Sequence, residues 1–137
     1  MAANTSPIFI GTPNTGIYAG ITAANTATDG TGTVYTVFTA GANGSYVRRL
    51  LVKALGSNVA TVMRVFVNNG STQGTASNNV LIREIPMTSS SASNSAAIGP
   101  DYEEVLNLVL KGGFVINVCI GTAVSGGYSV MAEGGDF

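Results

Sequence analysis

The stretch GTGTVYTVFTAGANGSYV, residues 30–47, can be interpreted in two ways that lead to different folds. Its glycine clusters and its β-branched, aromatic centre fit either a phosphate-binding loop or a β-strand between two turns. A phosphate-binding loop of the Walker kind is followed by a helix and ends on Lys-Ser or Lys-Thr. No lysine is present in this stretch, and Asp29-Gly30 and Asn43-Gly44 are dipeptides typical of tight turns. The stretch therefore predicts a strand over residues 34–40 with a turn at each end.

Alternation of apolar and other residues, the pattern of a half-buried strand, recurs in the segments after residue 47. Three rows of apolar residues each share one face of such a segment: Leu50, Val52 and Ala54; Met63, Val65 and Val67; and Phe114, Ile116, Val118 and Ile120. Asn117 and Cys119 fall on the opposite face of the third segment. We therefore expect Cys119 to be an inert strand residue rather than a nucleophile.

Residues 101–111, DYEEVLNLVLK, carry signals of both a helix and a strand. Acids near the start, a lysine at the end and glycines after it are typical of a helix. The leucines of this segment alternate, however, and its two valines are β-branched, which favours a strand. With this segment as a strand, the sequence predicts an all-β protein. The expected architecture is a jelly-roll-like β-sandwich of about eight short antiparallel strands.

Some predicted strands are apolar on both faces, which a single buried core does not explain. In the strand over residues 34–40, Val34 and Phe38 are expected on one face, and Tyr35 and Val37 on the other. A sheet that covers a core on one side and meets another subunit on its second side would have this pattern. The sequence therefore predicts a homo-oligomer.

Arginines interrupt several of these otherwise apolar strands. They are Arg48, Arg49, Arg64 and Arg83, whereas five of the seven acids lie in the last 37 residues. This distribution predicts ion pairs, either between strands of one chain or between subunits. Arg48, Arg49 and Arg64 are therefore candidate interface residues.

The first 28 residues contain no charged side chain, which is unusual for a segment in water. The prolines in this part lack N–H donors, which suits an extended arm or an edge strand. We predict an extended N-terminal arm over residues 1–15 and a single β-sandwich domain over residues 16–137. The apolar candidate interface residues near the two ends of the sequence are Ile8, Phe9, Ile10 and Phe137.

The composition offers little for chemistry. Charged residues make up 9% of the chain and the net charge is −1, so no basic surface for nucleic acid is expected, and no membrane segment. With no histidine and one cysteine, neither a Ser-His-Asp triad nor a zinc site of nitrogen and sulfur ligands is possible. Asp29 could contact Ca²⁺, but a turn is its expected role. We therefore expect no enzyme activity, no metal and no cofactor.

Three parts of the sequence resemble a family of small proteins encoded among the structural genes of tailed phages. They are ANTSPIF near the start, DGTGTVYTVFTAGANGSYVRRLLVKALG in the middle, and GYSVMAEGGDF at the end. The family combines a Ser-Pro-Ile-Phe-like start, a DGTGT…VFTAGANGS block and a V-x-A-x-GGD-aromatic end. Here these motifs occupy Pro7–Phe9, Asp29–Ser45 and Val130–Phe137, and REIP at residues 83–86 also matches.

The resemblance implies a virion component whose role is assembly. The leading hypothesis is a capsid decoration (cement) protein that binds between major capsid subunits, with a trimer as the favoured homo-oligomer. Such a protein is made in the host cytoplasm and ends on the surface of the virion head. The alternative is a tail or head fibre module that binds a host-surface glycan. Glycan-binding sites usually present aromatic platforms, and the absence of tryptophan argues against this alternative.

Overall fold

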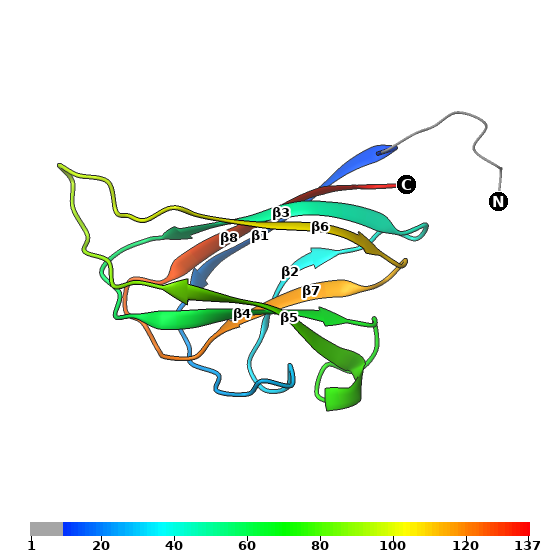
Figure 1. Cartoon of the computed structure of the whole chain (residues 1–137), viewed down its shortest axis with the longest axis horizontal. Coiled ribbons are helices and arrows are strands. Elements are labelled where there is room, and N and C mark those ends of the chain that lie inside the picture. Colours follow the sequence, from blue (N-terminus) through cyan, green and yellow to red (C-terminus); the bar gives the residue numbers. More distant parts are fainter. Residues whose placement is uncertain (1–9) are drawn as a thin grey trace.

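The computed structural model describes residues 10–137, which form two layers of β-strands (Figure 1). The strands are Thr12–Ile21 (β1), Tyr35–Thr39 (β2), Ser45–Ala54 (β3), Thr61–Asn68 (β4), Asn79–Met87 (β5), Tyr102–Leu110 (β6), Val115–Ile120 (β7) and Tyr128–Asp136 (β8). One 3-10 turn, Ala76–Asn78, precedes β5. Within the described part of the chain, no helix is long and apolar enough to cross a membrane. The all-β prediction is confirmed, including the strand over the contested residues 101–111.

The strand pairing is that of one long hairpin rolled into two sheets. The first sheet has the order β1-β8-β3-β6 and the second sheet has the order β2-β7-β4-β5. The antiparallel pairs β1–β8, β2–β7, β3–β6 and β4–β5 are the rungs of a hairpin whose tip lies between β4 and β5. Rolling this hairpin adds the pairs β3–β8 and β4–β7. The result is an eight-stranded jelly roll, as the sequence predicts.

The core between the two sheets consists of the alternating rows that the sequence identifies. Leu50 and Val52 of β3 and Met63 and Val65 of β4 belong to this core, and all four are buried. Ile116, Val118 and Ile120 of β7 complete the central layer. Each such side chain contributes roughly 1.5–3 kcal/mol when it is removed from water. Apolar burial of this kind therefore accounts for the choice of the inward face on each strand.

The expected faces of β2 are wrong, because the strand contains a bulge. Its register against β7 shifts between Thr36 and Phe38. A bulge adds one residue to one strand and reverses the alternation beyond it. Tyr35 therefore packs against the core on the same side as Phe38, although the sequence pattern puts them on opposite faces.

The glycines of residues 30–47 serve turns, as predicted. Gly30 and Gly32 have φ near +79° and Gly44 has φ +93°, a region that side chains rarely adopt. The carboxylate of Asp29 accepts hydrogen bonds from the backbone N–H and the hydroxyl of Thr31, at 3.0 and 2.6 Å. These bonds lower the pKa of Asp29 and give it the turn role expected from the sequence.

The predicted arm lies partly outside the described residues. Residues 1–9, with the candidates Ile8 and Phe9, are not described. β1 begins at Thr12, inside the range 1–15, and pairs with β8 from Asp136 backwards. Ile10 precedes β1 and covers Gly135, because a Cβ added to that glycine would lie 2.1 Å from Ile10 Cγ2.

Candidate functional site: the outer face of the first sheet

The outer face of the second sheet is covered by the chain itself. Phe66 and Cys119 alternate with core residues on β4 and β7 and so point away from the core. They are nevertheless 1% and 0% exposed. The cover includes the connection from β1 to β2, residues 22–34, which we call the strap. In Figure 1 the strap is the blue-to-cyan connection that passes below the second sheet.

Asn25 holds the strap against the second sheet through hydrogen bonds. Its backbone N–H donates to the Ile120 carbonyl at 2.7 Å, and its carbonyl lies 3.4 Å from Arg64 Nη1. Its side-chain amide donates to the carbonyls of Thr31 and Thr33, each at 2.8 Å. A buried side chain that satisfies several backbone groups holds a loop in one conformation. The strap is therefore an integral part of the domain.

The outer face of the first sheet has no such cover in the described chain. Ile17 of β1 is 75% exposed, and Val105 and Val109 of β6 are 50% and 67% exposed. Ile17 pairs with Met131 of β8, which pairs with Leu51 of β3, so these three side chains form one row across the sheet. Several exposed apolar side chains on one face of a domain often mark a binding site. This face is the candidate functional site.

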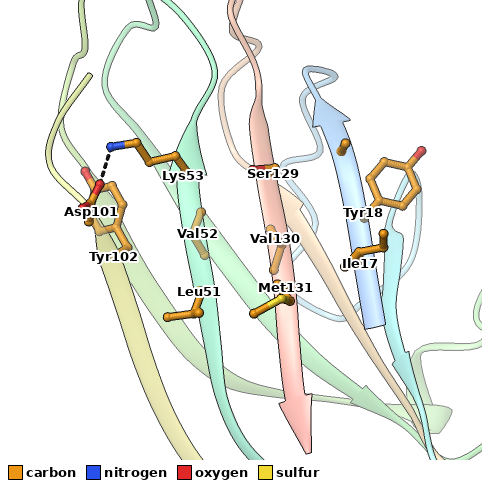
Figure 2. A pocket seen from close by; sticks show the side chains of 11 residues that line it. Ile17, Tyr18, Leu51, Val52, Lys53, Asp101, Tyr102, Ser129, Val130 and Met131 are labelled. Carbon is orange, nitrogen blue, oxygen red and sulfur yellow. Dashed lines mark hydrogen bonds and ion pairs between the residues drawn. The ribbon is translucent and has the colours of Figure 1, made fainter. Parts of the chain in front are cut away.

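A groove of about 550 Å³ lies on this face at the end of the sheet where β1 finishes. Figure 2 shows Leu51, Met131 and Ile17, which come from three neighbouring strands and line the groove. The Lys53–Asp101 ion pair borders one side of it, and Lys53 also donates to the Ile98 carbonyl. The lining is mainly apolar, so the groove suits apolar side chains better than a charged ligand.

The charges beside the groove are neutralised within the chain. Arg49 of β3 lies between two strands, with Nε 2.6 Å from Glu133 Oε2 and Nη1 3.0 Å from Glu103 Oε1. Arg48 adds a longer contact to Glu133 at 3.6 Å. The hydrogen bond from Arg49 lowers the pKa of Glu133, so this carboxyl remains ionised at neutral pH. A partner can therefore cover this face without supplying counter-charges.

The other strand arginines also pair inside the chain. Arg64 lies under the strap, with Nε 3.0 Å from Glu84 Oε1 of the neighbouring strand β5. Arg83 of β5 reaches Glu104 of β6 at 3.1 Å, which joins the open edges of the two sheets. Of the two pairings that the sequence allows, the structure contains the one between strands. Contacts of these arginines with another subunit stay a prediction.

The candidate interface residues do not form one cluster. Arg48 and Arg49 lie on the outer face of the first sheet, whereas Arg64 lies on the second sheet. Ile10 and Phe137 lie near the same end of the sandwich, where Phe137 is 45% exposed and its N–H donates to the Gly44 carbonyl. Ile8 and Phe9 lie outside the described residues.

Sequence reasoning missed the residues that line the groove. A usable signal is present in neighbouring apolar pairs, Leu50-Leu51 and Val130-Met131, where one member must point away from the core. Ile17 gave no such signal, because its strand mixes glycine, alanine and threonine without clear alternation. The exposure of its side chain depends on which strand β1 joins and on the absence of a cover.

The described residues contain no arrangement that points to metal binding. No group of three or more cysteine, aspartate or glutamate side chains in residues 10–137 is placed to hold a metal ion. Burial raises the pKa of the Cys119 thiol, so it is not an activated nucleophile. Comparisons of the chain with protein-family models, curated proteins and solved structures found no match.

Proposed function

We propose that the chain is a structural protein of a tailed-phage virion, a decoration protein that binds between major capsid subunits on the head. The observation that carries this proposal is the difference between the two outer faces. One is covered by the strap, whereas the other leaves Ile17, Val105 and Val109 in solvent. A monomer in water gains nothing from such exposure, but a subunit of an assembly does.

Three further features support an assembly role. The jelly roll is a fold found in viral capsid domains, although lectins and other proteins also have it. Arg49 on the proposed face is already paired with Glu103 and Glu133 within the chain, so a partner can cover it at a smaller desolvation cost. The motifs that resemble those of small phage structural proteins occur at the start, in the middle and at the end of the sequence.

The abundance of the chain in purified virions of the phage that encodes it tests the proposal. We expect hundreds of copies per particle, measured by quantitative mass spectrometry against the major capsid protein. A handful of copies would favour the alternative, a tail or head fibre module that binds a glycan. Absence from purified virions would contradict both assignments.

A binding measurement tests the proposed surface. Val109→Lys places a charge on the exposed face of the first sheet, and we expect it to weaken attachment to heads that lack the protein by at least tenfold. Val80→Lys on β5 is the matched control, because Val80 is similarly exposed, at 61% against 67%. Equal binding of both variants would exclude this face as the attachment surface.

A further inference from the structure

The groove beside β1 is formed by Ile17, Leu51 and Met131 and has a volume of about 550 Å³. This volume lies within the roughly 300–1,000 Å³ of pockets that enclose organic ligands, so it can accept side chains of a short segment. Its charged neighbour Lys53 is paired with Asp101. The groove therefore favours an apolar segment without charged side chains.

The chain itself contains such a segment. Residues 1–9 have the sequence MAANTSPIF, with no charged side chain and with Ile8 and Phe9 at its end. These two apolar residues directly precede Ile10, whose side chain lies against Gly135. Gly135 and Met131 are both outward-facing positions of β8, so the segment starts at the face that contains the groove.

A chain cannot readily fill its own groove with these two residues. Gly135 and Met131 are four residues apart on β8, which is about 13 Å along a strand. Ile8 is two residues from Ile10, so their Cα atoms are at most about 7 Å apart. The reach of Ile8 and Phe9 from Ile10 is therefore shorter than the distance from Gly135 to Met131 along β8. No such limit applies to the same residues of another copy.

The area of the outer face of the first sheet also favours an exchange of N-terminal segments between copies. Four strands about 4.8 Å apart and nine residues long at about 3.3 Å per residue give a footprint of roughly 600 Å². Two copies in contact through the groove half of this face alone would bury about 600 Å² in total, below the roughly 1,200–2,000 Å² of specific interfaces. Exchanged N-terminal segments would add the area that a stable association needs.

We propose that the groove binds Ile8 and Phe9 of a second copy of the chain. The inference rests on the proposed function, because it takes the outer face of the first sheet as a protein-binding surface. Each copy then supplies one segment and one groove, so the exchange can close into a dimer or a ring. The segment links the subunits, and the Val105–Val109 part of the face remains available to the capsid.

Cross-linking between two single-cysteine variants tests the exchange. Phe9→Cys and Met131→Cys chains are mixed at micromolar concentration under mild oxidation, since a disulfide forms only when the Cα atoms approach to about 4.4–6.8 Å. We expect a mixed disulfide dimer, and none from Phe9→Cys with Val80→Cys. The native Cys119 is 0% exposed and should not react. Absence of the mixed dimer, or equal yield with Val80→Cys, would overturn the proposal.

The double variant Phe9→Cys/Met131→Cys shows whether residues 8 and 9 bind the groove of another copy or the groove of their own chain. Links between chains support the proposal, and a monomer closed by an internal disulfide overturns it. Ile17→Lys should in addition lower the mass measured by light scattering to that of a monomer, while Val80→Lys keeps the parent mass. A parent protein that is monomeric at micromolar concentration overturns the exchange, even if it attaches to virions. Exchange without attachment to virions instead refutes the proposed function alone.

Discussion

At the scale of single residues, the Asp136 side chain links β3, β1 and the turn between β2 and β3. One carboxylate oxygen, Oδ1, accepts hydrogen bonds from Ser45 Oγ at 2.5 Å, Asn14 Nδ2 at 2.9 Å and the Gly41 N–H at 3.3 Å. These donors belong to β3, β1 and the turn between β2 and β3. Hydrogen bonds from Ser45 and then Asn14 hold the pKa of Asp136 below its ordinary value. The ionised carboxylate therefore stabilises the fold.

The sign of this effect gives a prediction for Asp136→Asn. A carboxyl whose pKa is lower in the folded state contributes stability above about pH 4, and this stability is lost as the pH falls through the folded pKa. We expect the variant to lose about 1–2 kcal/mol at pH 7, because hydrogen bonds to a charged acceptor are replaced. The difference from the parent should shrink at pH 3.

Thermal unfolding of both proteins at pH 7 and pH 3 checks this prediction. Asp101→Asn serves as the control, since the Asp101 side chain is 82% exposed and its ion pair with Lys53 is a surface pair. A loss that is the same at pH 3 and pH 7 would show that the charge of Asp136 has no part in it.

At the scale of elements, β1 and β2 close one side of the sandwich without pairing. They lie in different sheets, yet the β1 residue Gly16 is so close to β2 that an added Cβ would lie 1.7 Å from the Val37 carbonyl oxygen. Asn14 Nδ2 crosses the same gap to the Thr39 carbonyl at 3.0 Å. The opposite side of the sandwich is instead joined by the Arg83–Glu104 ion pair.

We predict that Gly16→Ala separates β1 from β2. The clash is with backbone, which cannot move aside as a side chain can, so the free energy of unfolding should fall by about 3 kcal/mol. Gly74→Ala is the control, because nothing lies within 4 Å of the added Cβ there. Denaturant unfolding of both variants measures the two changes. A Gly16→Ala protein as stable as the Gly74→Ala protein would show that the close approach of the two strands is wrong.

At the scale of the whole molecule, the domain and the N-terminal segment should be separable. The core, the strap and β1 are complete from Ile10 onward, so deletion of residues 1–9 removes no contact described within the sandwich. The segment ends in the apolar residues Ile8 and Phe9, which in the proposed exchange bind the groove of a second copy. Its contribution should therefore appear in association rather than in folding.

Deletion of residues 1–9 is expected to leave the unfolding temperature of dilute protein within a few degrees of the parent value. The same deletion should reduce the mass measured by light scattering at micromolar concentration. Circular dichroism controls for an intact all-β fold. A drop in the unfolding temperature of ten degrees or more in dilute monomer would mean that the segment belongs to the core of its own domain.

Much of the fold follows from local features of the sequence. Alternation identifies which residues of β3, β4 and β7 face the core, since a strand turns successive side chains to opposite sides. Asp29-Gly30 and Asn43-Gly44 mark turns because glycine tolerates positive φ. The same alternation decides the contested segment, whose leucines all point to one side in β6.

The candidate site was decided only by the tertiary structure. Phe66 and Ile17 are both apolar and both point away from the core, yet one is 1% and the other 75% exposed. The strap lies over the second sheet at Arg64 and Cys119, whereas Ile17 on the outer face of the first sheet stays exposed. Similarly, the bulge in β2 brings Tyr35 and Phe38 to one side. Periodicity shows which residues share a face, but contacts between residues far apart in the sequence determine what covers that face.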